Sequence, residues 1–170
     1  MVRRFLSLIA SLAILTSTAH AEPKATLQST GLDDLHGCEF LGDSMTLSIS
    51  DGGREIVRKT YCSAYGQGSV KIVPDAQGRQ YVLLEQAEGH GTNFSTTYLD
   101  VFRLGDALVE QQRVLISELA GLTSRWTYAY GVEKPRTGGL TLRMTLHLDG
   151  DGQTFVPSPK KRKIIQIDAR

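Results

Sequence analysis

Apolar and polar residues alternate along many short segments of this chain. The clearest alternation covers residues 140–148, where leucine or methionine occupies every even position and threonine, arginine or histidine the odd ones. Residues 44–50 alternate in the same way, and Asp51-Gly52-Gly53 follows them. A period of two is typical of a half-buried strand, and Asp-Gly favours a tight hairpin turn that requires positive φ. We therefore predict strands in both segments and a hairpin after the second.

Weaker patterns predict more strands at a spacing of about ten residues. They cover residues 54–61, 69–73, 81–84, 98–104, 123–130 and 163–167. The segments 81–84 and 98–104 are apolar on both faces, which is typical of central strands. Short strands separated by turns indicate an all-β fold, an antiparallel meander of about eight or nine strands that closes into a barrel or a sandwich. We expect a single domain over residues 44–170, preceded by an irregular arm at residues 22–43.

Residues 107–120 allow two interpretations. Their apolar positions fit a helical stripe, with Asp106 in an N-cap position and Gly121 just beyond the end. As a strand, the segment is interrupted by polar residues 110–113, which an edge of a sheet tolerates. The spacing of the neighbouring turns favours the strand.

The N-terminus has the features of an export signal. Arg3 and Arg4 precede an apolar run from Phe5 to Leu15, and the small-residue pattern Ala19-His20-Ala21 follows. These are the charged region, the apolar region and the cleavage site of a secretory signal peptide. We expect residues 1–21 to be removed and the protein to act in the periplasm or outside the cell.

The charge balance excludes some partners. Of 19 basic residues, 17 lie beyond the signal, against 18 acidic ones. A nearly neutral chain has no overall electrostatic attraction to nucleic acid, so we expect no nucleic-acid partner. After the signal, no apolar stretch approaches the roughly 18 residues that a membrane-spanning helix needs.

Two cysteines, Cys38 and Cys62, follow the signal. In an exported protein, a lone pair of cysteines favours one disulfide. The alternative is a metal or redox site that includes His36, but the spacing matches no zinc or haem pattern. We therefore predict a disulfide and no metal or cofactor.

The loop Glu88-Gly89-His90-Gly91-Thr92-Asn93 is the main candidate for a binding site. It joins the two segments predicted to be most buried, and loops on a rigid sheet often carry binding residues. Histidine changes charge near neutral pH and is a common metal ligand. We select His90 and Asn93, with Tyr65 in the loop 64–68, as candidate binding residues. The simpler interpretation is a glycine-rich hairpin loop that happens to contain a histidine.

Two further features have a structural and a functional interpretation. The basic run Lys160-Lys161-Arg162-Lys163 could contact an anionic surface, but solvated lysines that protect an edge strand explain it more simply. The aromatic residues Trp126, Tyr128 and Tyr130 could form a contact surface, but the chain has few other aromatic residues to fill a core. We favour the structural interpretation of both features.

These observations favour a small exported binding or accessory protein that is not an enzyme. Its partner would be an unknown protein or small ligand in the cell envelope. The sequence contains no Gly-x-Ser-x-Gly nucleophile motif. One alternative is an exported hydrolase or metal-dependent enzyme that uses His90 with a carboxylate. Another is a structural envelope protein whose edges and basic run form subunit contacts.

Overall fold

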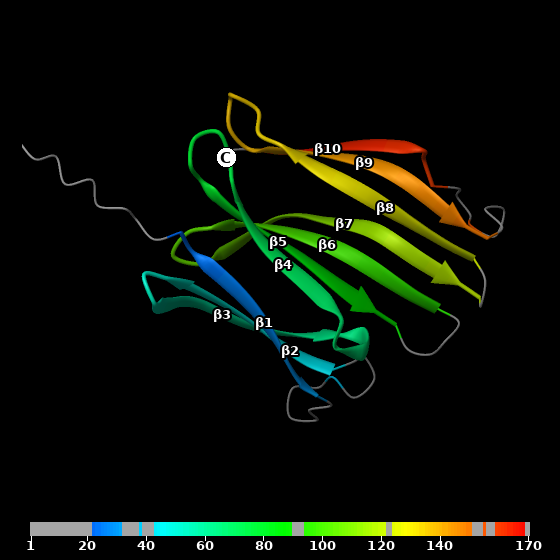
Figure 1. Cartoon of the computed structure of the whole chain (residues 1–170), viewed down its shortest axis with the longest axis horizontal. Helices are drawn as coiled ribbons and strands as arrows, with labels where there is room; N and C mark the ends of the chain where they lie inside the picture. The colour runs from blue at the N-terminus through cyan, green and yellow to red at the C-terminus, as the bar shows by residue number, and fades with distance from the viewer. Residues whose placement is uncertain are drawn as a thin grey trace, which may run out of the picture.

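The computed structural model describes residues 22–31, 38, 43–89, 94–121, 124–150, 155 and 159–168. These residues form two antiparallel sheets (Figure 1). The smaller sheet has the order β1-β2-β3, with β1 (Lys24–Gly31), β2 (Asp43–Asp51) and β3 (Arg54–Ser63). The larger sheet has the order β10-β9-β8-β7-β6-β5-β4. Its strands are β4 (Gly68–Pro74), β5 (Gln80–Glu88), β6 (Phe94–Leu104), β7 (Leu108–Ala120), β8 (Ser124–Glu133), β9 (Leu140–Asp149) and β10 (Arg162–Ile167).

The predicted all-β, antiparallel architecture is confirmed. The hairpin between β2 and β3 turns through Gly52 and Gly53, whose φ angles of 56° and 84° fit the positive φ that an Asp-Gly turn requires. The contested segment 107–120 contains the strand β7, as favoured from the sequence. Within the described residues the pairings close neither sheet into a barrel.

One prediction fails at the N-terminus, because β1 lies within the segment that we expected to be irregular. The described residues therefore contain ten strands rather than eight or nine. β1 pairs with β2 in antiparallel register, with Leu27 opposite Leu47. Ala25 and Leu27 pack against a buried cluster, while Lys24, Thr26 and Gln28, which alternate with them, are polar and exposed. β1 is thus held by its pairing and by a few apolar contacts, which a hydrophobic pattern detects poorly.

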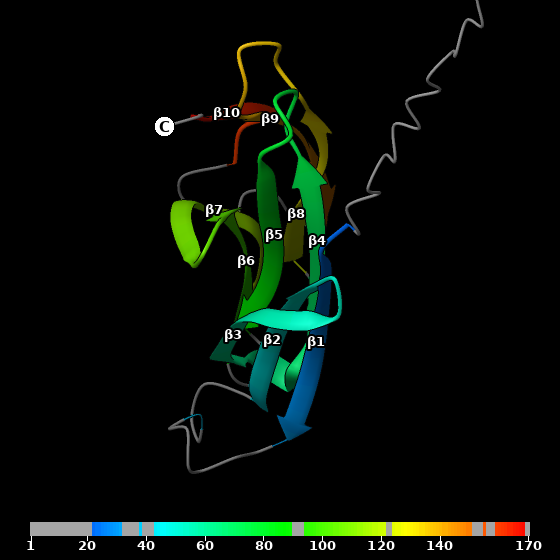
Figure 2. The ribbon, with the colours of Figure 1, turned by 90° about the vertical axis from the view of Figure 1, so that its left-hand side faces the viewer.

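β5 and β6 are buried on both faces, as predicted. On one face, Val82, Leu84 and Phe102 pack with Leu47 and Ile49 of β2. The residues that alternate with them on β5 and β6 belong to a second, larger cluster, which also includes residues of β7 to β10. Figure 2 accordingly shows β5 and β6 between β1–β3 below and β9 and β10 above.

The larger sheet opens between β7 and β8. These strands pair only through Ser117–Ala120 and Ser124–Thr127, next to their connecting turn. β7 pairs with β6 along its whole length, and β8 with β9 from Arg125 onwards. Beyond the shared turn, β8 therefore follows β9 away from β7 and approaches β4 and β5, which creates the groove described next.

Candidate functional site

A groove of about 360 Å³ lies where β4 to β8 come together. We call it the β4–β8 groove. Of the side chains that line it, only those of Ala87 and Ile116 are apolar. The polar lining includes Gln67, Ser69, Glu85, Thr97, Arg125 and Thr127. The groove thus offers hydroxyl and amide groups, one carboxylate and one guanidinium to a ligand.

Glu85 and Tyr130 join β5 to β8 beside this groove. The Tyr130 hydroxyl donates a hydrogen bond of 2.6 Å to Glu85 Oε1. Burial and this hydrogen bond to the carboxylate raise the pKa of Tyr130, so the phenol keeps its proton. The Lys71 ammonium lies 4.4 Å from the centre of the Tyr130 ring, in cation–π contact. Glu85 is therefore held in place where it lines the groove.

The opposite wall depends on hydroxyl contacts between β7 and β8. The Oγ atom of Ser117 lies 2.9 Å from Thr127 Oγ1 and donates to the Trp126 carbonyl at 2.9 Å. The Trp126 indole N–H donates to Glu118 at 3.1 Å. These bonds fix the short paired region of β7 and β8, from which Arg125 and Thr127 reach the groove.

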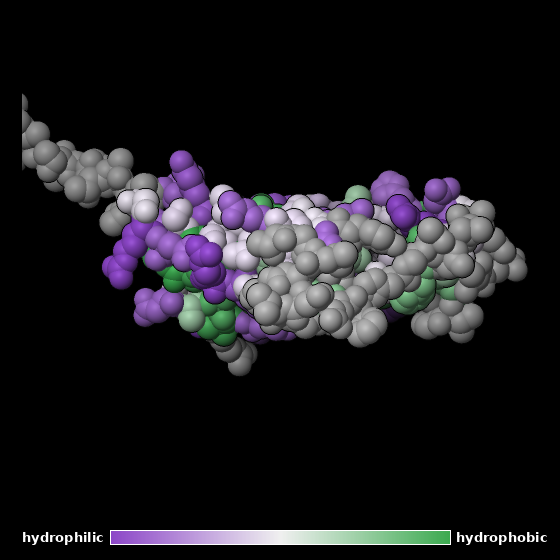
Figure 3. Space-filling model, turned by 90° about the horizontal axis from the view of Figure 1, so that it is seen from below, coloured by the Kyte–Doolittle hydropathy of each residue, from purple (hydrophilic) through white to green (hydrophobic). Residues whose placement is uncertain are grey.

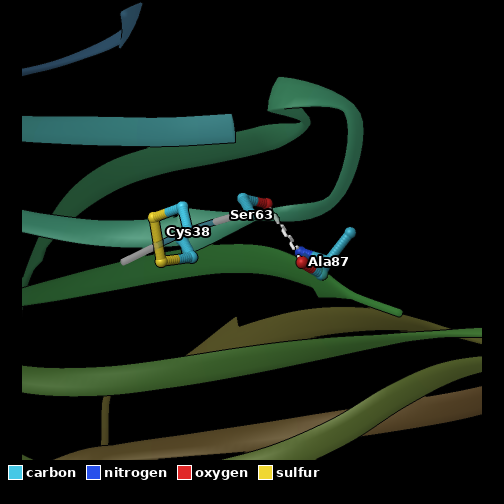
Figure 4. Close-up of a disulfide and its surroundings, with 4 residues drawn as sticks. Cys38, Ser63 and Ala87 are labelled. Carbon is cyan, nitrogen blue, oxygen red and sulfur yellow. Dashed lines mark hydrogen bonds between the residues drawn. A yellow bond between two sulfur atoms is a disulfide. The ribbon is translucent and has the colours of Figure 1, made fainter. Parts of the chain in front are cut away.

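Ser63 and the disulfide secure the end of β3 next to the groove. Cys38 and Cys62 form the predicted disulfide, with their Cα atoms 5.5 Å apart. The buried Ser63 Oγ accepts a hydrogen bond from Ala87 N at 3.0 Å (Figure 4). It also donates to the Gln67 carbonyl at 2.5 Å. Because Gln67 and Ala87 both line the groove, this serine connects the disulfide-bonded strand to its wall.

The groove includes Ala87 near the end of β5, the strand that leads into the loop selected from the sequence. His90 and Asn93 are outside the described residues, but Gly89 and Phe94, which flank that segment, are described. Gly89 has a φ of 114°, and a Cβ atom there would lie 3.0 Å from the Phe94 carbonyl oxygen, so the position requires glycine. Tyr65 lies in the 3-10 helix η2 (Ala64–Gly66), and this helix directly precedes Gln67. The side chain of Tyr65 is outside the described part.

The acidic residues near this loop lie on different faces of the sheet. Glu85 contacts Tyr130, whereas Glu88 forms an ion pair with Arg113. The Arg113 Nε atom also lies 3.5 Å from the buried Asp100, and its guanidinium stacks 4.1 Å above the Tyr98 ring. Burial raises the pKa of Asp100 above its ordinary value. These carboxylates thus form two separate clusters.

The remaining candidates from the sequence lie where their role in the fold explains them. Trp126 and Tyr128 are each only 5% exposed and belong to the larger core, in agreement with the structural interpretation. Lys160–Lys163 are exposed beside and within the edge strand β10, as expected for residues that protect an edge. Among the described residues, no group of three histidine, cysteine, aspartate or glutamate side chains could hold a metal ion.

Sequence reasoning did not find Glu85, Arg125 or Tyr130 as a common site. The chain positions of Glu85 and Tyr130 differ by 45, and they meet only because β8 departs from β7. Comparison of the chain with family models, curated proteins and solved structures finds no match. Within the described residues, no helix is long and apolar enough to cross a membrane.

Proposed function

We propose that this chain is an exported binding module, not an enzyme, which holds a small polar ligand or a polar segment of a protein partner in the β4–β8 groove. Its volume is at the lower end of the range for ligand sites, about 300–1,000 Å³. The observation that carries the proposal is the polar lining, in which a fixed carboxylate and a guanidinium accompany neutral hydroxyl and amide groups.

The scaffold suits such a role. We interpret the two packed sheets as a β-sandwich, which provides a rigid support for the groove and for the loop containing His90 and Asn93. A disulfide next to the groove is compatible with a periplasmic or secreted protein. In the coloured part of the face seen from below, hydrophobic side chains gather in separate patches among hydrophilic ones (Figure 3).

The test is an NMR titration of the chain from Glu22 onwards, with its disulfide intact, against a panel of small sugars, amino acids and short peptides. We expect one class to shift the amide signals of Ser69, Glu85 and Thr127. Arg125→Gln should abolish these shifts, whereas Arg136→Gln, an exposed guanidinium in the β8–β9 loop, should leave them unchanged.

The same titration distinguishes the alternatives. Shifts centred on Gly89 and Phe94 without the groove would assign binding to the His90 loop alone, and His90→Ala would then remove them. Conversion of a peptide or sugar during the titration, lost in His90→Ala, would favour the hydrolase. If no member of the panel shifts the groove signals, the groove is not a site for these ligands.

A further inference from the structure

The edge strand β10 has a dense basic run. Lys160, Lys161, Arg162 and Lys163 are consecutive and exposed, and among the described residues none of them forms an ion pair. Like charges at this density repel one another, and the cost falls when anions approach. The run is therefore a part of the described surface that favours an anionic partner.

The backbone of this run is fixed in position. The Tyr128 hydroxyl donates to the Lys160 carbonyl at 2.7 Å, and Leu146 N donates to the Lys161 carbonyl at 3.0 Å. Arg162 and Lys163 pair with Thr145 and Met144 of β9. The backbone of the run is therefore anchored to the sheet at all four positions, with Arg162 and Lys163 on opposite faces of β10.

An apolar residue lies directly beside these cations. Ile164 is 58% exposed, the largest exposure among the large hydrophobic residues described. It lies opposite Arg143, and the neighbouring positions Ala129 and Gly131 of β8 are exposed and small. The outer face of β8–β10 thus carries Ile164 and Arg162 together with the Arg143–Glu133 ion pair, and Lys160 and Lys161 directly precede the strand. Lys163 lies on the opposite face of β10, which it shares with the packed Ile165.

Two kinds of anionic partner are conceivable for an edge strand, and the sequence of β10 favours one of them. An acidic strand could add to the free edge, but charged side chains along an edge oppose strand addition. An anionic bilayer needs no strand pairing, attracts clustered lysines, and accommodates an exposed isoleucine at its headgroup boundary.

We propose that Lys160, Lys161, Arg162 and Ile164 dock the protein onto an anionic membrane surface, with the cations at lipid phosphates and Ile164 at the headgroup boundary. This inference does not use the β4–β8 groove, so its failure would leave the proposed function intact. Docking of this kind is peripheral and reversible, because few charges and one apolar side chain take part.

Vesicle co-sedimentation of the chain from Glu22 onwards tests the proposal. We expect binding to vesicles that contain phosphatidylglycerol, no binding to pure phosphatidylcholine, and a steep loss with added salt. Each lysine near an anionic surface contributes about fivefold to binding, so Lys160→Gln with Lys161→Gln should weaken it by about 25-fold. Ile164→Ser, in the otherwise unchanged chain, should also weaken binding at low salt, where the cations still hold the protein to the vesicles.

The matched control is Lys134→Gln with Arg136→Gln, which removes two exposed cations from the β8–β9 loop. It should bind as the parent does, and the thermal midpoints of all variants should agree. The proposal is wrong if phosphatidylglycerol vesicles do not sediment the protein, or if the control loses as much binding as the double variant. Capture by soluble polyglutamate but not by vesicles would instead identify an acidic protein partner.

Discussion

At the scale of single residues, two buried aspartates show that the hydrogen-bond partners of a carboxylate decide whether its pKa is lowered or raised. The Asp75 side chain is fully buried and accepts hydrogen bonds from Gln77 N, Arg79 N, Arg79 Nε and Gly139 N at 2.8–3.0 Å. Asp100 is similarly buried, but Arg113 approaches it only at 3.5 Å. Burial opposes ionisation in both, and only Asp75 has hydrogen bonds that outweigh it, so the pKa of Asp75 falls to about 2.

Asp75→Asn should destabilise the fold. The amide turns a donor towards groups that are themselves donors, so buried N–H groups lose their acceptor, at a cost on the order of 3 kcal/mol. Because the folded pKa of Asp75 lies below the ordinary value, the stabilisation that its ionised carboxylate provides is complete above about pH 4. It disappears as the pH falls towards 2. Urea unfolding at several pH values measures it. Asp106→Asn, at an exposed turn, should have little effect.

Asp100→Asn should have the opposite effect. A carboxyl group whose folded pKa is raised makes the protein most stable at acid pH, and stability falls as the pH rises from the ordinary value through the folded one. At neutral pH the neutral amide should therefore increase the free energy of unfolding, by about 1 kcal/mol. The gain should vanish in acid. A loss of stability at neutral pH would mean that attraction to Arg113 outweighs burial.

At the scale of elements, regular alternation predicted the strands that have one buried face, such as β2 and β9. The ambiguity over β7 has a physical cause. Its pairing with β6 shifts register between Thr97 and Tyr98 and again between Val101 and Phe102. Such irregularities interrupt the period of two, so the apolar positions of β7 also fit a helix. The meeting of Glu85 and Tyr130 could not be predicted, because the divergence of β8 from β7 leaves no local pattern in the sequence.

Gly68→Ala should disturb the element pair β4–β5 at the groove. A Cβ atom at Gly68 would lie 2.9 Å from the Glu85 carbonyl oxygen, and a backbone atom cannot move aside without loss of strand pairing. We expect a decrease of about 1–3 kcal/mol in the free energy of unfolding and altered amide signals in the groove. Gly131→Ala is the matched control, because a Cβ atom there meets nothing within 4 Å. Equal effects of both variants would refute the close approach of the two strands.

At the scale of the whole molecule, the disulfide lies beside a hydrogen bond that joins the two sheets at the groove. Cys62 is next to Ser63, and Ser63 bonds to Ala87 at the end of β5. The disulfide spans a sequence separation of 24, for which the chain-entropy model gives a stabilisation of about 3.5 kcal/mol. Its removal should therefore lower global stability and also loosen the wall of the groove formed by Gln67 and Ala87.

Cys38→Ala with Cys62→Ala separates these two effects through amide hydrogen exchange. The Ala87 N–H, which bonds to Ser63, should exchange faster by a larger factor than the Leu83 N–H in the middle of β5, because Ser63 loses the constraint next to it. Ser63→Ala in the disulfide-bonded protein should accelerate exchange at Ala87 alone. If the double variant accelerates exchange equally along β5, the disulfide stabilises the molecule only globally, and the groove wall depends on sheet pairing instead.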